Sequence, residues 1–277
     1  MSENPLQKLY RNKKVYVSLP SGGRFYNSGV KLSADNEIGV MPMTATDEIK
    51  LKTPDALFNG EALYELFKSC VPDIENPREI PVCDIDKLLL AIRMATSGST
   101  LEIKSTCPKC KHIEKYDVDL GVIMNSAQEI TEDNAVTLDD DIIVETRPLT
   151  LQSQIMAQMD SFYQYRMQQM INDDSVPDEQ KAKEFNEILV QAITLQTGQV
   201  ASCITKVTLD EDTQVTDSEH IFEWVENMDS HTHRKIKDCI EKLSDPKMSD
   251  SVTIKCSQEE CGHEYKANID LNPVNFF

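Results

Sequence analysis

The sequence is poor in basic residues relative to its acidic content. Lys and Arg together number 28 among 277 residues, against 47 for Asp and Glu, so the formal net charge is −19. A nucleic-acid-binding surface needs clustered Lys and Arg to displace the counterions around phosphates, and anionic lipid also repels an acidic protein. The charge balance therefore predicts no nucleic acid and no membrane among the partners.

Long apolar runs are missing as well. The longest apolar stretch, around residues 88–92, is far shorter than the ~20 residues that cross a bilayer. The N-terminal sequence MSENPLQKLYRNKKVYV has no apolar core behind its charges, so it does not match a signal peptide. We expect the protein to be made and kept in a cytosol.

Sequence signatures of catalysis are also missing. The turn PSGG at residues 20–23 lacks the longer glycine pattern and the Lys and Ser or Thr of a phosphate-binding loop, so we interpret it as a tight turn with glycine at positive φ. No Ser or Cys has a His and an acid placed suggestively near it, and no carboxylate pair stands out. We predict that the protein is not an enzyme.

Eight cysteines are present, and in a reducing compartment they indicate metal binding or burial rather than disulfides. Four of them stand alone in helical or apolar surroundings. We predict that these four are buried core thiols. They are Cys70, Cys83, Cys203 and Cys239.

The other four cysteines form two pairs, Cys107 with Cys110 and Cys256 with Cys261. The pairs lie in similar stretches, LEIKSTCPKCKHIEKYDVDL and VTIKCSQEECGHEYKANIDL, in which a strand runs into the cysteines and a second strand returns. Each stretch predicts a β-hairpin whose turn aims two sulfurs at one point. Four thiolates from two such turns form the usual closed, tetrahedral structural zinc site, so we predict Zn²⁺ bound by all four.

Alternatives to this zinc site stay open. His112 and His263 each follow a second cysteine by two positions, and either could replace a thiolate, although we expect both outside the ligand set. A redox pair is expected at a helix N-terminus, whereas the residues after Cys110 predict a strand. Thiols without metal are the third alternative. A closed four-ligand site leaves no position for water, so the predicted metal stabilises the fold and performs no chemistry.

The two cysteine pairs are separated by residues 111–255, so the hairpins must meet across an inserted region. The predicted fold class is α+β, mostly helical, with a split zinc ribbon and a helical insertion between its halves. The predicted segments are N-terminal strands and turns (1–50), a helical segment (51–98), the first hairpin (99–121), the helical insertion (122–250), and the second hairpin with a C-terminal tail (251–277).

Apolar residues recurring with the helical period predict several helices. The helix at residues 85–96 is expected to have Asp84 as its N-cap and Gly98 at its end. Another helix is predicted to begin at residues 53–55, where Thr, Pro and Asp form a typical start. The remaining predicted helices span residues 61–71, 151–171, 178–197 and 218–243.

Apolar side chains in these helices have two interpretations. Methionine is flexible enough to adapt to a partner surface, but apolar residues at every third or fourth helical position usually face their own domain, so we favour packing. The helix at 178–197 has its apolar face at Phe185, Leu189 and Ile193. The methionines are Met41, Met43, Met156, Met159, Met167 and Met170.

Several longer strings carry a family resemblance. They are LPSGGRFY, VMPMTATDEIKLKTPDALFNGEAL, CVPDIENPREIPVCDIDKLLLAIRMATSG leading into CPKC, the second cysteine pair, and the C-terminal NPVNFF. Together they resemble the baseplate hub proteins of T-even-type contractile-tailed bacteriophages. The likeness is strongest over residues 15–120, recurs at 252–277, and is loose across the predicted insertion.

The resemblance implies a protein that builds the central hub of a phage tail baseplate and has no catalytic residues. We expect a non-enzymatic assembly factor that holds hub or tape-measure proteins in the host cytoplasm during phage assembly. A structural hub subunit retained in the virion tail is the alternative, and self-association stays open. A zinc-ribbon nucleic-acid-binding or transcription factor ranks lower, because neither cysteine hairpin carries a net basic stripe.

Overall fold

The computed structural model describes residues 6, 9–53, 60–171, 177–210, 212–269 and 276. Over these residues the fold is mixed, with 45% helix and 21% strand, so the prediction of a mostly helical α+β fold is wrong. The strands that the prediction missed are short and lie in the region expected to be a helical insertion. The predicted segment boundaries stay a prediction.

The helices of the described chain vary from one turn to seven. None of them is long and apolar enough to cross a membrane. The α-helices are α1 (Ala45–Leu51), α3 (Glu61–Cys70), α4 (Val82–Ser97), α5 (Leu120–Ser126), α6 (Leu151–Ile171), α7 (Asp178–Cys203), α8 (Ser218–Asn227) and α9 (Ser230–Ser244), and short 3-10 helices cover η2 (Pro77–Glu79) and η3 (Asp139–Asp141).

The strands pair only in antiparallel fashion within the described residues, as three two-stranded sheets and one sheet of order β5-β6-β7-β8. The two-stranded sheets are β1 with β2, β3 with β4, and β9 with β10. The strands are β1 (Val15–Ser18), β2 (Glu37–Val40), β3 (Thr100–Thr106), β4 (Ile113–Asp119), β5 (Ala135–Thr137), β6 (Ile143–Thr146), β7 (Ile204–Thr208), β8 (Gln214–Val215), β9 (Ser251–Lys255) and β10 (Glu264–Asn268).

Helix α4 lies at the centre of the larger hydrophobic core and contacts β1, β2, α5, α6 and α9. The apolar residues that recur along it with the helical period are buried, and Gly98 follows its last residue as predicted. Burial of this face supplies the main stabilisation of the surrounding elements, because apolar side chains removed from water each contribute about 1.5–3 kcal/mol. The face consists of Ile85, Leu88, Leu89 and Ile92.

Asp84 is not the N-cap of α4, which corrects the prediction. The helix begins at Val82 after Pro81, and Asp84 lies fully buried in its first turn. Its carboxylate accepts hydrogen bonds from the Ser21 N–H (2.8 Å), the Ser21 hydroxyl (2.6 Å) and the Tyr26 hydroxyl (2.8 Å). Burial raises the pKa of Asp84 despite these three donors. Its side chain therefore holds the LPSGGRFY segment against α4, and that segment turns at two glycines of positive φ, as predicted.

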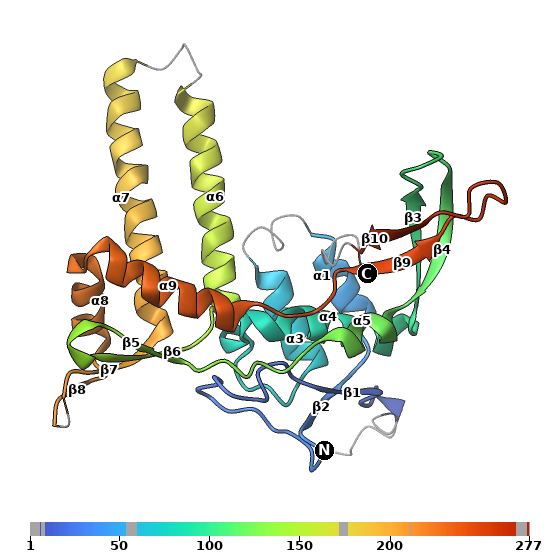
Figure 1. Ribbon diagram of the computed structural model, residues 1–277, viewed down its shortest axis with the longest axis horizontal. Coiled ribbons are helices and arrows are strands. Elements are labelled where there is room, and N and C mark those ends of the chain that lie inside the picture. The colour runs from blue at the N-terminus through green and yellow to red at the C-terminus, as the bar shows by residue number, and fades with distance from the viewer. Residues whose placement is uncertain are drawn as a thin grey trace.

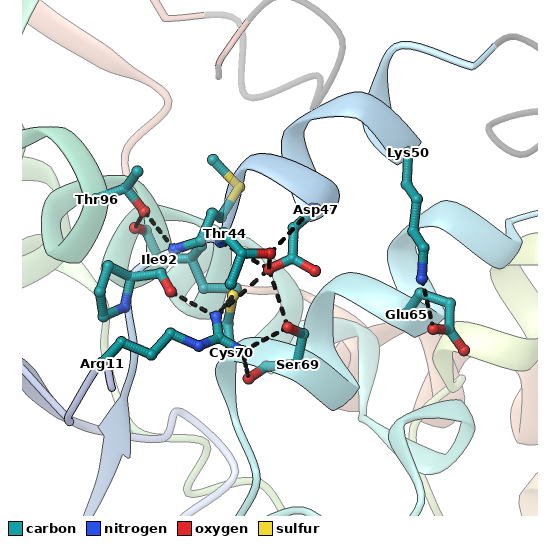
Figure 2. A network of polar contacts seen from close by, with 11 residues as sticks. Arg11, Thr44, Asp47, Lys50, Glu65, Ser69, Cys70, Ile92 and Thr96 are labelled. Atoms are coloured by element: carbon teal, nitrogen blue, oxygen red, sulfur yellow. Dashed lines mark hydrogen bonds and ion pairs between the residues drawn. The ribbon is translucent and has the colours of Figure 1, made fainter. Parts of the chain in front are cut away.

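Helix α1 was missed by the sequence analysis, although its capping box is a local signal. The Thr44 hydroxyl accepts from the Asp47 N–H, and the Asp47 carboxylate accepts from the Thr44 N–H at 2.8 Å. Arg11 extends this network by donating to the Ser69 hydroxyl at 2.6 Å (Figure 2) and to the Pro42 carbonyl at 2.6 Å. The predicted helix start at residues 53–55 falls mostly on residues 54–59, which lie outside the described residues.

A second core lies between the β5–β8 sheet, the base of α7, and helices α8 and α9. The single helix predicted over residues 218–243 is two helices, because Asp229 caps α9 by accepting from the N–H groups of His231 and Thr232. Apolar periodicity also predicts a stripe of Ile236, Ile240 and Leu243. Ile236 and Ile240 are buried in this core, whereas Leu243 is buried in a small separate cluster with Cys83 and Ile130.

Helices α6 and α7 run side by side and project from the rest of the molecule, at the opposite side from β3, β4, β9 and β10 (Figure 1). We name this pair of helices the arm. Its two legs are rooted in different cores, since Leu151 and Ile155 of α6 belong to the larger core and Ala201 and Cys203 of α7 belong to the second. The arm therefore connects the two cores. The side chains of Met159, Phe162, Met167 and Met170 lie outside the described residues.

Candidate metal centre and arm groove

The two cysteine-bearing hairpins form as the sequence predicts. We name β3–β4 and β9–β10 the cysteine hairpins, and they lie next to one another in Figure 1. Burial alternates along each strand, so each hairpin has one buried and one exposed face. The buried faces join the larger core through Val118 and Val252. An isolated hairpin is marginally stable, so each needs this packing.

The cysteine turns of the two hairpins differ in length but share two backbone features. The Cys107 N–H donates to the His112 carbonyl at 2.8 Å, and the Cys256 N–H donates to the His263 carbonyl at 2.9 Å. The residue after each second cysteine has positive φ, +62° at Lys111 and +50° at Gly262. The histidine that follows each pair thus closes the turn through its backbone carbonyl.

The four sulfurs converge on one point. Cys107 Sγ lies 3.8 Å from Cys261 Sγ, Cys110 Sγ lies 3.6 Å from Cys256 Sγ, and all four sulfurs lie within 4.8 Å of one another. A disulfide would need about 2.05 Å, whereas the edge of a tetrahedron with Zn–S bonds of about 2.3 Å is roughly 3.8 Å. The spacing therefore fits a four-coordinate metal ion between the hairpins.

The pKa values of Cys107 and Cys256 are shifted in opposite directions. Burial raises the pKa of Cys107, but backbone N–H groups of Cys110 and Lys109 donate to its sulfur, and the pKa falls to about 7. The Gln258 N–H favours the Cys256 thiolate, yet burial and the neighbouring sulfurs raise its pKa to about 12. Adjacent thiolates repel one another at these distances. A bound cation removes that repulsion, so the donor set can bind a metal ion.

Neither histidine belongs to the group of side chains that can share a metal ion. The His112 Nε2 atom lies 3.7 Å from a carboxylate oxygen of Glu114. The His263 ring stacks on Tyr265 with 6.2 Å between ring centroids. These contacts agree with the expectation that both imidazoles stay outside the ligand set.

The remaining cysteines are mostly buried, as predicted. Cys70, Cys83 and Cys203 are fully buried, and burial raises the pKa of Cys70 and of Cys203 to about 11. Cys239 differs, because it is half-buried and its thiol lies 3.4 Å from the Thr146 hydroxyl. At neutral pH the buried thiols are protonated and unreactive.

A groove of about 680 Å³ lies at the base of the arm, where α6 and α7 meet η2 and α8. We name it the arm groove. It combines apolar side chains with two arginines on a strongly acidic chain. Its lining includes Arg78, Arg147, Met156, Leu195, Gly198 and Phe222.

The two arginines of the arm groove differ in their partners. Arg78 forms an ion pair with Glu61 at 3.1 Å. Arg147 donates from Nε to the Ser202 carbonyl at 2.9 Å, and among the described residues no carboxylate lies within 4.0 Å of its guanidinium.

Glu79 also lines the groove. Burial raises the pKa of its carboxyl, but hydrogen bonds from Ser28 and Asn76 together with the charge of Arg147 lower it overall. Arg147 therefore lies near a carboxylate without forming an ion pair with it, and its guanidinium can still bind a ligand in the groove. The sequence analysis missed this site, and a local signal for it is Gly198 inside a helix.

The apolar face predicted for the helix at residues 178–197 is exposed, contrary to the expectation of packing. Phe185 is 37% exposed, Leu189 43% and Ile193 57%. We name these three residues the outer stripe. Ile188 and Leu195 of the same helix are half-buried. Helix α7 thus has both exposed and half-buried apolar positions.

The sequence of the chain also matches the model of one protein family. This family is described as T4 bacteriophage base plate protein, and the match covers residues 12–277. No curated protein and no solved structure shows a significant match. A protein of this family has a role in the phage baseplate and interacts with other baseplate proteins. Because the match spans nearly the whole sequence, the chain belongs to the T4 bacteriophage base plate protein family, as its resemblance to T-even-type phage proteins predicted.

Proposed function

We propose that the protein is a non-enzymatic assembly factor of the phage baseplate hub, which holds a segment of a hub or tape-measure protein in the arm groove. The observation that carries this proposal is the groove itself. It is the place where apolar side chains meet an arginine that forms no ion pair within 4.0 Å among the described residues, on a chain of net charge −19. Protein-binding sites typically combine an apolar anchor with a few polar groups that fix orientation.

The side chains that line the groove indicate which kind of client segment would bind there. Met156, Leu195 and Phe222 provide apolar contacts, and methionine adapts its shape to different partners. Arg147 is suited to a carboxylate, because the guanidinium binds carboxylates through paired hydrogen bonds. A segment with an apolar side chain next to an Asp or Glu fits best. Elsewhere the acidic surface repels such a segment, which favours this binding position.

The state of the titratable groups supports a role without catalysis. The buried carboxylates of Asp84 and Asp47 accept hydrogen bonds from several donors each, so neither is poised as a general base. The four clustered thiols leave no open coordination position if all of them bind one ion. We propose that this ion is Zn²⁺, held as a structural metal by Cys107, Cys110, Cys256 and Cys261.

The zinc supplies stability rather than reactivity. It joins two hairpins that lie far apart in the sequence, and binding free energy of this kind adds directly to folding free energy. The hairpins also pack against the larger core, in which the base of α6 is rooted. The metal therefore helps to fix the body from which the arm projects.

Substitution of Gly198 tests the client site without weakening the fold. A Cβ at this position would lie 3.9 Å from Phe222 Cε2, an ordinary contact, and both alanine and phenylalanine form a helix more readily than glycine. Gly198→Phe should fill the groove and abolish capture of the client from infected cells, as identified by mass spectrometry. Gly198→Ala is the matched control and should retain capture. Equal capture by both variants would contradict the proposal.

The charge of Arg147 provides a second test of the same site. Arg147→Gln keeps hydrogen-bonding capacity but removes the cation, so affinity for an acidic client peptide should fall about tenfold. Arg78→Gln is the comparison, because Arg78 is already paired with Glu61. A larger loss with Arg78→Gln than with Arg147→Gln would argue against the assigned orientation.

The stage at which the protein acts can be measured on purified phage particles. We expect quantitative mass spectrometry to find the chain absent from virions and present in the host cytoplasm during assembly. Stoichiometric presence in the tail would instead identify a structural hub subunit. Retention on DNA that weakens with salt would contradict the proposed absence of nucleic acid among its partners.

A further inference from the structure

A second groove, of about 490 Å³, lies where the two cysteine hairpins meet helix α5. We name it the edge groove. Its lining includes the consecutive residues 117–119 of β4 and 251–254 of β9. Successive side chains of a strand point to opposite faces of its sheet, so a groove that touches all of them runs along the edge of the strand. In the part of the chain that the structure describes, β4 and β9 each have a partner strand on one side only, so the edge groove lies along two free edges.

The backbone hydrogen bonds of the hairpins leave groups that face the edge groove. The Cys256 N–H donates to the His263 carbonyl at the turn of the β9–β10 hairpin. Bonded and non-bonded pairs alternate along antiparallel strands, so Thr253 and Lys266, three positions further along, are a non-bonded pair. The N–H and C=O of Thr253 therefore point away from β10, and the same alternation turns those of Asp117 away from β3. Among the described residues these four groups have no hydrogen-bond partner, so they are available to a further strand.

The charges around the edge groove favour a basic occupant. Asp117 lies directly opposite Glu102 in the β3–β4 register, and like charges in this position repel each other. Lys115 neutralises Glu102, with 2.6 Å between Nζ and Oε1. No basic side chain of the described residues lies within 4.0 Å of the Asp117 carboxylate, and the lining of the groove includes no basic residue. A Lys or Arg of a bound segment would therefore form an ion pair with Asp117.

The edge groove also offers apolar contacts. Val122 of α5 lines it and is 64% exposed. Ile254 of β9 lines it too and is half-buried against the larger core. The side chains of an extended segment alternate between two sides, so a segment of apolar residues alternating with Lys or Arg can use the apolar contacts and Asp117 together. This charge is opposite to that of the acidic client segment of the arm groove.

We propose that an extended segment of another baseplate protein, in which apolar residues alternate with Lys or Arg, binds in the edge groove as a strand added to β9. Its backbone pairs with the free edge of residues 251–254, and one of its cations binds Asp117. Backbone pairing of this kind provides affinity, and the side-chain contacts provide selectivity. Members of this family interact with other baseplate proteins, and the net charge of −19 steers a basic segment toward the chain.

Titration calorimetry of the full chain with a short synthetic peptide that alternates Val and Lys tests the added strand. The free edge of β9 is short, so we expect a dissociation constant on the order of 100 µM. A peptide of the same length that alternates Val and Glu is the charge control, and it should not bind measurably. Hydrogen exchange should show that the Val-Lys peptide protects the backbone amide of Thr253, which faces the groove.

Proline substitutions separate backbone pairing from attraction by the net charge. Thr253→Pro removes an N–H that faces the edge groove but no bond of the β9–β10 ladder, so it should weaken binding of the Val-Lys peptide at least about tenfold. Asn268→Pro is the matched control, because Asn268 is exposed and lies opposite Ser251 in a non-bonded pair, on the far edge of the same sheet. It should leave binding unchanged. Circular dichroism should show both variants folded, since each keeps the ladder.

A second variant leaves the backbone intact. Asp117→Asn should weaken binding of the Val-Lys peptide about fivefold, whereas Asp35→Asn, an equal change of charge at an exposed position outside the groove lining, should not. Equal dissociation constants for these two variants would overturn the assigned ion pair.

Three results would overturn the added strand itself. They are no binding of the Val-Lys peptide at about 1 mM, equal binding of the Val-Glu peptide, and equal dissociation constants for Thr253→Pro and Asn268→Pro. Gly198→Phe fills the arm groove and should bind the Val-Lys peptide as the wild type does, so failure of this inference and failure of the client site can be told apart.

Discussion

The cysteine hairpins and the arm use their side chains in opposite ways. In the hairpins, one face packs into the larger core and four sulfurs converge within 4.8 Å. These side chains make their contacts within the chain. In the arm, an apolar stripe and an arginine-bearing groove have no partner of that kind. The difference indicates that the packed faces and the sulfurs of the hairpins stabilise the molecule and that the arm contacts other molecules. The following substitutions test that contrast.

The largest effect is expected at the metal centre. Cys110→Ser removes one of four ligands and disconnects two distant hairpins, so the free energy of unfolding should fall by on the order of 4 kcal/mol. Cys203→Ser places a hydroxyl at another buried thiol position and should cost about 1–2 kcal/mol. Urea denaturation of both variants measures the difference. Equal and mild losses would count against a metal at the cysteine cluster.

Metal removal should act on the hairpins and spare the arm. A strong chelator is expected to expose the backbone amides of β3, β4, β9 and β10 to hydrogen exchange, since isolated hairpins are marginally stable. The helices of the arm hold no ligand, so their exchange should change little. Mass spectrometry of peptides from the two regions measures both rates. Unchanged hairpin exchange, or equal loss of protection in the arm, would break the contrast.

The network around Asp47 can be compared with the metal centre, because polar contacts alone stabilise it. Burial raises the pKa of Asp47, but hydrogen bonds from Thr44 and Ser69 and the charge of Arg11 lower it below 3.8 overall. A lowered pKa stabilises the folded chain at pH values above the ordinary, unfolded-state pKa. This contribution is lost as the pH falls through the folded-state pKa. Asp47→Asn should therefore destabilise by about 1–2 kcal/mol at neutral pH.

Acid titration of stability checks the sign of this effect. The difference between wild type and Asp47→Asn should shrink as urea denaturation is repeated from about pH 7 down to about pH 3. Asp35→Asn, at an exposed position, controls for the change in net charge. A difference that grows in acid would contradict the assigned role.

A smaller effect is expected from the backbone of the two cysteine turns. Lys111 has a positive φ that glycine adopts without strain, so Lys111→Gly should be neutral or stabilise by up to about 1 kcal/mol. Gly262→Ala should destabilise the chain by about 1 kcal/mol, because alanine is strained at this positive φ. The added Cβ itself would meet no clash, since the nearest atom, Lys255 Cε, would lie 3.7 Å away. Thermal denaturation of both variants gives the sign. Shifts in the same direction would show that the turns are not equivalent.

The smallest effect is expected in the outer stripe. Leu189→Gln changes an exposed side chain of the arm, so the free energy of unfolding of the dilute chain should change by less than about 0.5 kcal/mol. The melting temperature at low concentration measures this directly. A large destabilisation would mean that the arm packs against its own body, and the contrast with the hairpins would fail.

The sequence predicted best what depends on neighbours in the chain. The cysteine turns were recognised because each pair lies between two alternating strands, and the bounds of α6 were correct because its apolar pattern is continuous. Asp84 was misassigned because its partners, Ser21 and Tyr26, lie about 60 residues away. No local pattern reports such contacts.

Two other errors have different causes. The break between α8 and α9 had a local signal in Asp229, but the apolar periodicity continues through it and concealed the cap. The mixed fold was missed because the strands of the four-stranded sheet are as short as two residues, as in Gln214–Val215. The exposure of Phe185 could not be predicted, since periodicity identifies a face and not what covers it.

The metal content of the purified chain tests most directly whether one ion joins the two hairpins. Elemental analysis by plasma mass spectrometry should find one zinc per chain in wild type and in Cys203→Ser, and none retained in Cys110→Ser. A wild-type chain that is free of metal and yet keeps its full stability would contradict the proposed zinc-bound hairpins.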